Sequence, residues 1–226
     1  ASKLQYCDGG LWRASIDAFL ERRSLRDATC IDLSNVAYSM AIIARSNKGA
    51  VPGFSQSDIE QVTREIVGAA YVIVKSPNPE FVDSQGIKNI FWACYMLKCN
   101  PGKVELDALL QTFARREHYG GATARSVSSV VFAVSGLERE CGYKPSISQS
   151  LWESILLDDV AVGRVANATP MDVSDLAFSV RQLLSATPPY LTRECAVGCI
   201  GMLMGGRTVH GLSTWSIMDV STVMCV

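Results

Sequence analysis

The sequence predicts an all-α protein, an α-solenoid of about five stacked helix pairs with no strands, over residues 1–226. Three observations predict this fold. A short line of residues recurs along the chain, and its apolar positions follow a helical spacing. A second helical stretch follows each complete copy. Links rich in glycine, proline, asparagine and serine separate the units.

The repeated line is aligned on Asn35, and its successive copies are 54, 40, 46 and 47 residues apart. A period in the forties with variable insertions is typical of helix-pair repeats. The copies read NVAYSMAII (35–43), NIFWACYML (89–97), SVVFAVSGL (129–137), DLAFSVRQL (175–183) and TVMCV (222–226). The apolar positions of the first copy form a helical stripe rather than a strand alternation: Val36, Ala37, Met40 and Ile43.

The second helix of each unit is expected just after its copy. Residues 9–25 have the pattern of such a helix, left over from a preceding unit. The others are expected at residues 57–76, 104–119, 146–160 and 188–204. Ser57 with Glu60, and Ser150 with Glu153, have capping-box spacing, and two prolines fall in the first turn of the last helix. Because one pair cannot bury its own apolar face, stacked pairs share a core, and we expect one solenoid segment of a longer protein.

Composition narrows the function classes. Charged residues make up 19% and hydrophobic residues 48% of the chain, as in a globular protein, and the net charge of −1 gives no general attraction for nucleic acid. No apolar run reaches the roughly 18–20 residues of a membrane span. The sequence contains no G-x-S-x-G, P-loop, G-x-G-x-x-G or H-E-x-x-H motif. We therefore expect neither an enzyme nor a small-molecule substrate, and no membrane association.

The eight cysteines are mostly set in apolar helical patterns, which predicts buried free thiols. Cys195 and Cys199 share one helix face and could hold a metal with outside ligands. Core packing is the interpretation that we favour, because the chain has two histidines and no C-x-x-C pair. No metal or other cofactor is expected.

The copy NIFWACYML carries a family resemblance, through its order of asparagine, aliphatic, apolar, tryptophan and alanine, with leucine four places later. It resembles octotricopeptide repeats and the related heptatricopeptide-type repeats that accompany RAP domains in organellar proteins. The resemblance covers nearly the whole chain. Ser129, Asp175 and Thr222 replace the asparagine, however, and Cys225 replaces the aromatic residue. The resemblance implies a mitochondrial or, alternatively, plastid location, contact with RNA, and membership of a ribosomal or RNA-processing assembly.

Candidate RNA-binding residues start each copy or belong to a basic cluster. They are Ser34, Asn35, Lys88, Asn89, Arg115, Arg116, Ser128, Ser129, Ser174 and Asp175. Amide and hydroxyl groups can hydrogen-bond base edges, and cations can meet phosphates. The polar residues that start the copies are also preferred helix caps, which is the interpretation that we favour. For the basic cluster, we favour a solvated face.

Tyr38, Trp92, Phe132 and Phe178 form an aromatic column, one from each complete copy. Such side chains can stack on bases. Because they share a helix with the apolar stripe, we expect packing between units instead, with the aromatic column largely buried. The residue pairs that start the copies form a polar column, which we expect on the concave face: residues 34–35, 88–89, 128–129, 174–175 and 221–222. On this interpretation, Trp92→Ala lowers the free energy of unfolding by about 3–5 kcal/mol.

Two function classes remain. The first is a non-catalytic RNA-binding subunit of an organellar ribonucleoprotein, such as a mitochondrial ribosome or an RNA-editing complex, with RNA and other protein subunits as partners. The second is a protein–protein scaffold of the armadillo or HEAT kind with no RNA contact. The resemblance favours the first class, and the near-neutral charge favours the second.

Overall fold

The computed structural model describes residues 8–21, 25, 27–76, 83–115, 122–157, 168–187 and 189–205. Within these ranges the chain forms helices joined by turns and loops, without a strand, which confirms the all-α prediction there. The helices are α1 (Gly9–Leu20), α3 (Cys30–Ser46), α4 (Gln56–Lys75), α5 (Ser84–Met96), α6 (Lys103–Phe113), α8 (Ala124–Cys141), α9 (Gln149–Leu157), α11 (Pro170–Ser185) and α12 (Arg193–Gly205). None of these described helices is long and apolar enough to cross a membrane.

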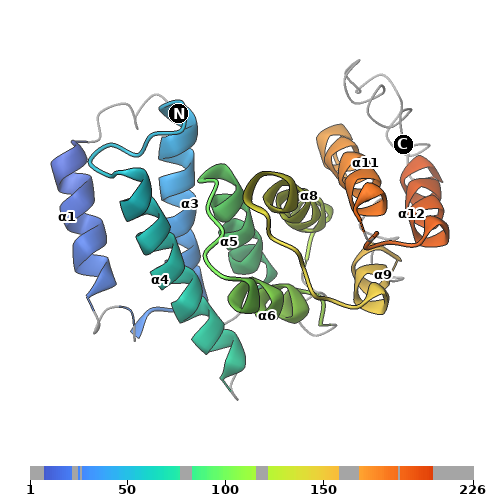
Figure 1. Cartoon of the computed structure of the whole chain (residues 1–226), viewed down its shortest axis with the longest axis horizontal. Coiled ribbons are helices and arrows are strands. Elements are labelled where there is room, and N and C mark those ends of the chain that lie inside the picture. The colour runs from blue at the N-terminus through green and yellow to red at the C-terminus, as the bar shows by residue number, and fades with distance from the viewer. Residues whose placement is uncertain are drawn as a thin grey trace.

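The four helices that carry the repeated line, α3, α5, α8 and α11, are called the first helices here, and α4, α6, α9 and α12 the second helices. α3 contacts α5, α5 contacts α8, and α8 contacts α11. Among the second helices, α4 contacts α6 and α9 contacts α12. Figure 1 shows the helices in a row that begins with α1 and ends with α11 and α12. The four complete copies, which lie far apart in the sequence, are therefore neighbours in space, and the fifth (222–226) lies outside the described residues.

Each first helix begins at the same distance before its copy of the line. The N-cap residues are Thr29, Asp83, Thr123 and Thr169, and each side chain accepts a hydrogen bond from a backbone N–H of the first turn. Every one of them lies six residues before the first residue of the line. The interpretation of the polar column as helix caps is therefore wrong. Those residues lie in the second turn, where the backbone N–H groups already have helical partners.

The second helices begin at other residues than the sequence predicted. In α4 the capping box joins Ser55 and Asp58, not Ser57 and Glu60. The Asp58 carboxylate accepts from the Ser55 backbone N–H at 2.8 Å, and the Ser55 hydroxyl accepts from the Asp58 N–H at 3.2 Å. The helix therefore begins two residues earlier than the spacing of Ser57 and Glu60 predicted.

The starts of α9 and α12 also differ from the prediction. At α9, the Ser148 hydroxyl accepts from the Leu151 N–H at 3.3 Å, so the cap lies two residues before Ser150. At α12, the Thr192 hydroxyl accepts from the Cys195 N–H at 3.1 Å, and the helix begins at Arg193. Pro189 therefore precedes this helix instead of opening it, and Pro188 lies outside the described residues.

Buried apolar residues from α1 to α12 form one core cluster. The predicted stripe of α3 is buried at Ala37, Met40 and Ile43, whereas Val36 is half-buried. The described cysteines are free thiols, and those within the core are Cys30, Cys94, Cys99, Cys195 and Cys199. Burial raises the pKa of the Cys30 thiol to about 12. The predictions of buried free thiols and of core packing at the last two are confirmed; Cys7 and Cys225 lie outside the described residues.

The capping box of α3 makes the stability of the protein depend on acid pH. The Asp32 carboxylate accepts from the Thr29 backbone N–H at 2.9 Å and from its hydroxyl at 2.7 Å, and these bonds lower the pKa of Asp32. A carboxyl whose pKa is lowered on folding stabilises the fold above its unfolded-state pKa, near about 4, and loses this contribution as the pH falls through the folded-state pKa. We therefore expect the free energy of unfolding to fall below about pH 4, by a modest amount because Asp32 is exposed.

Urea unfolding of the wild type and of Asp32→Asn, compared at about pH 6 and about pH 3, tests this expectation. The variant should be less stable than the wild type near neutrality, and this difference should shrink in acid. A difference of the same size at both pH values would contradict a contribution from the Asp32 carboxylate.

Candidate functional site

A groove of about 390 Å³ crosses all four first helices. It is called the first-helix groove here. Its lining residues are Tyr38, Arg45, Lys88, Trp92, Tyr95, Met96, Arg125, Ser129, Phe132, Met171, Asp172 and Asp175. The lining comes from all four first helices because each of them begins at the same distance before its copy of the repeated line. Residues at the start of each copy, and three positions later, lie on the same helix face, and neighbouring first helices present that face side by side.

Aromatic rings run through the groove from helix to helix. The Tyr38 and Trp92 ring centroids are 5.0 Å apart, and the Tyr95 and Phe132 rings form a T-shaped pair with centroids 5.5 Å apart. Phe132 and Phe178 follow at 6.1 Å. These distances are those of favourable aromatic pairs. The rings therefore hold neighbouring first helices together and at the same time present apolar surface to the groove.

The predicted burial of the aromatic column is wrong for Tyr38, which is 38% exposed. Trp92, Phe132 and Phe178 are half-buried. The apolar stripe of each helix does face the core, but the aromatic residue lies at the edge of that stripe. There it packs against an aromatic ring of a neighbouring first helix and leaves part of its surface accessible. Tyr38 belongs to the first complete copy and has an aromatic neighbour on α5 alone.

Cations lie on the α3, α5 and α8 parts of the groove. Partial burial lowers the pKa of the Lys88 ammonium, and the charge of Arg125 on the adjacent helix lowers it further. Among the described residues, no carboxylate forms an ion pair with Lys88. Two like charges held close together on neighbouring helices repel each other, and an anion between them would relieve that repulsion. This part of the groove is therefore suited to an anionic ligand.

Carboxylates lie at the α11 end. Asp172 is buried, and its carboxylate accepts from the Thr169 backbone N–H at 3.0 Å and from the Ser128 hydroxyl at 3.4 Å. It serves as the capping-box residue of α11 and links this helix to α8. Asp175 is half-buried in the same stretch. The groove is therefore electrostatically polarised, and an anionic chain is favoured from α3 to α8 and disfavoured at α11.

Of the ten predicted site residues, the groove brings together Lys88, Ser129 and Asp175. Asn35 is exposed and Ser174 half-buried, but neither lines the groove. Arg115 is exposed just after α6 and is not part of the groove lining, and Arg116 lies outside the described residues.

Three of the predicted residues face inward. Ser34 and Ser128 are buried, and the Ser34 hydroxyl donates to the Ile31 carbonyl at 2.9 Å. The Ser128 hydroxyl shares its one hydrogen between the Arg125 carbonyl, at 3.2 Å, and the Asp172 carboxylate. Asn89 is buried, and its side-chain oxygen accepts from the Gln85 amide at 3.2 Å. These polar groups are satisfied within the protein. In the structure they are therefore not presented to a ligand.

The sequence-based site missed four groove residues that matter to its chemistry and shape. They are Arg45, Tyr95, Met96 and Arg125. Arg125 lies four residues before Ser129, one turn earlier on the same face, so helical spacing alone carries a signal for it. Tyr95 follows Trp92 by three residues and carries the same signal.

Comparison of the chain with protein-family models, with curated proteins and with solved structures gives no match.

Proposed function

We propose that this chain binds single-stranded RNA along the first-helix groove, as a non-catalytic subunit of an organellar ribonucleoprotein. The observation that carries the proposal is the combination of partly accessible aromatic rings with the cationic groups of Lys88 and Arg125 in one groove. Bases stack on aromatic side chains, and phosphates are attracted to lysine and arginine. A groove with both features suits a single strand, whose bases are free to turn towards the protein.

We propose further that the helix pairs are units of an α-solenoid, of which about five are encoded in the chain. The equivalent N-caps of the first helices support this, as do the contacts between successive first helices. The resemblance of the repeated line to octotricopeptide and heptatricopeptide-type repeats supports RNA as the ligand. It also supports a mitochondrial or plastid location in a ribosomal or RNA-processing assembly.

The geometry suggests how a strand would lie. Bases would rest against Tyr38 and Trp92, which are paired across α3 and α5. Phosphates would meet Lys88 and Arg125, and the Ser129 hydroxyl beside them offers a donor and an acceptor to a base edge or a 2′-hydroxyl. The carboxylates of α11 would keep the strand towards the α3 side of the groove.

Binding of fluorescent single-stranded RNA at two salt concentrations tests the proposal. We expect affinity that weakens as salt rises. Lys88→Ala should reduce the slope of log affinity against log salt by about 0.7, the value for one phosphate contact with a single strand. Trp92→Ala should weaken binding by about 1–3 kcal/mol if one base stacks on it. Lys75→Ala, at the exposed end of α4, is the matched control and should leave binding unchanged.

Circular dichroism of each variant separates lost binding from lost structure. An absence of salt-dependent RNA binding in the folded wild type would contradict the proposal. That result would favour the protein scaffold. This second function is supported by the near-neutral charge and by exposed apolar side chains on the second helices, Val72 at 66% and Val104 at 64%.

A further inference from the structure

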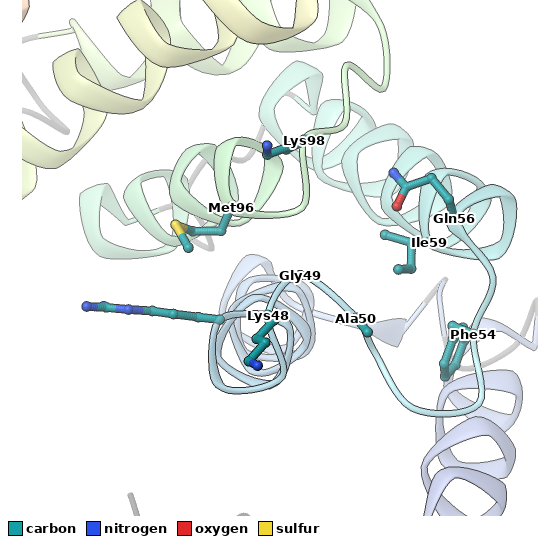
Figure 2. A pocket seen from close by; sticks show the side chains of 9 residues that line it. Lys48, Gly49, Ala50, Phe54, Gln56, Ile59, Met96 and Lys98 are labelled. Carbon is teal, nitrogen blue, oxygen red and sulfur yellow. The ribbon is translucent and has the colours of Figure 1, made fainter.

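A second hollow, called the helix-end pocket here, lies where α3 and α5 end and α4 begins. Its volume is about 690 Å³. Figure 2 shows Met96 and Lys98 on one side of it, Lys48 and Gly49 on the opposite side, and Gln56 closing a third side. The complete lining is Arg45, Lys48, Gly49, Ala50, Phe54, Gln56, Ile59, Met96 and Lys98.

The lining of this pocket is cationic. It contains Arg45, Lys48 and Lys98 and no carboxylate. The nearest acid on Lys98 is Glu140, at 3.8 Å from the ammonium, and the Lys98 side chain is 74% exposed. An ion pair so long and so exposed compensates little of the positive charge. The pocket therefore attracts anions.

The backbone gives an independent indication. Lys48 and Lys98 have φ angles of 56° and 52°, and among the described residues they are the non-glycine residues in the left-handed region. Each follows the end of a first helix, where glycine is the usual choice. At the end of α8 the chain does use a glycine, Gly142, with φ 67°. Strained non-glycine residues of this kind cluster at functional sites, and here both residues line the same pocket.

The helix-end pocket adjoins the first-helix groove, because Arg45 and Met96 line both. A strand that leaves the groove past α3 would therefore meet Arg45 and then the two lysines. The polarity of the groove agrees with this path, since its carboxylates lie at the opposite end, on α11. The positive charge of the pocket, its two strained lysines and its shared lining with the groove therefore all favour the same path for a strand.

We propose that the helix-end pocket binds backbone phosphates of the same single-stranded RNA, through Lys48 and Lys98, at the α3 end of the groove. This inference rests on the proposed function, and it adds the helix-end pocket to the RNA-binding site in the groove. The RNA is then held at two places. Bases stack in the groove, and phosphates beyond the stacked bases enter the pocket.

The test compares RNA oligonucleotides of increasing length on the wild type and on the double variant Lys48→Gly/Lys98→Gly. For the wild type, affinity should rise with length and rise again once the strand reaches the pocket. The double variant should lose this last rise, and its salt slope should be smaller by about 1.4, from two phosphate contacts at about 0.7 each. Between about 50 and about 200 mM salt, the wild type should then lose about sevenfold more affinity than the variant.

Glycine suits the left-handed backbone, so the unfolding midpoint of the double variant should stay the same or rise, which excludes misfolding as the cause of weaker binding. Lys48→Arg/Lys98→Arg keeps the charge and should bind long RNA like the wild type. If short RNA binds but long RNA binds no tighter, or if the glycine variant binds long RNA normally, the pocket inference is overturned and the groove proposal stands. If folded wild type binds RNA of no length, both fail.

Discussion

Phe91→Ala is expected to lower the free energy of unfolding by about 3–5 kcal/mol, the range for truncating a fully buried large aromatic residue. Phe91 has no exposed surface and belongs to α5, which packs between α3 and α8. Its removal leaves a cavity in the core cluster to which it belongs. Because the interior is close-packed, the neighbouring side chains lose contacts that water does not replace.

The adjacent residue provides the matched comparison. Trp92 lies one position further along α5, half-buried at the edge of the groove. Trp92→Ala should therefore cost clearly less stability than Phe91→Ala, although tryptophan is the larger side chain, and should instead weaken RNA binding. The sequence predicted the loss of stability of a fully buried aromatic residue at Trp92, and its half-buried position now predicts a smaller loss. Urea unfolding of both variants gives the comparison, and an equal or larger loss for Trp92→Ala would place Trp92 in the core after all.

Gly136→Ala is expected to destabilise the protein by about 1–3 kcal/mol, the range for overpacking a well-packed contact. A Cβ at Gly136 would lie 2.4 Å from Cε2 and 2.5 Å from Cδ2 of the Tyr95 ring, far inside contact distance. The Tyr95 ring also packs against Phe132, with the ring centroids 5.5 Å apart, so a displacement of the ring would disturb a second contact. The overlap should outweigh the roughly 1 kcal/mol that alanine gains over glycine in a helix.

Gly68→Ala is the control for this substitution. Gly68 lies inside α4, where an added Cβ would meet no atom within 4 Å, so helix propensity acts alone and the protein should become more stable by up to about 1 kcal/mol. A double-mutant cycle with Tyr95→Ala should recover part of the Gly136→Ala loss, since the clashing ring is gone. If both glycine variants changed stability in the same direction, the close packing of Tyr95 on α8 would be contradicted.

Much of the fold could be read from the sequence because its signals are local. The helical spacing of the repeated line predicts α3, α5, α8 and α11, since apolar residues must lie on one face to be buried. Helix starts were less predictable. Ser55 and Ser57 both offer a hydroxyl, and Asp58 and Glu60 both offer a carboxylate. The choice between them depends on where the loop from α3 delivers the chain.

The site was predicted only in part, because exposure depends on neighbours in space. Asn35 and Asn89 hold equivalent positions in two copies, yet one is exposed and the other buried. α5 has a first helix on each side, whereas the described neighbours of α3 include a first helix on one side only. The sequence alone treats the two copies alike. It could not distinguish a residue at the end of the row from its counterpart within it.

What the sequence by itself determined is the set of helices and the face of each one that must be apolar, since both follow from residue spacing along a single helix. Tertiary structure alone decided which side chains share a surface. Lys48 and Lys98 are 50 residues apart in the chain, and they line one pocket because α3 and α5 pack together and end at the same edge. Tyr95 and Gly136 meet for the same reason, across α5 and α8. Such contacts are set by the packing of helices against one another, which no local pattern encodes.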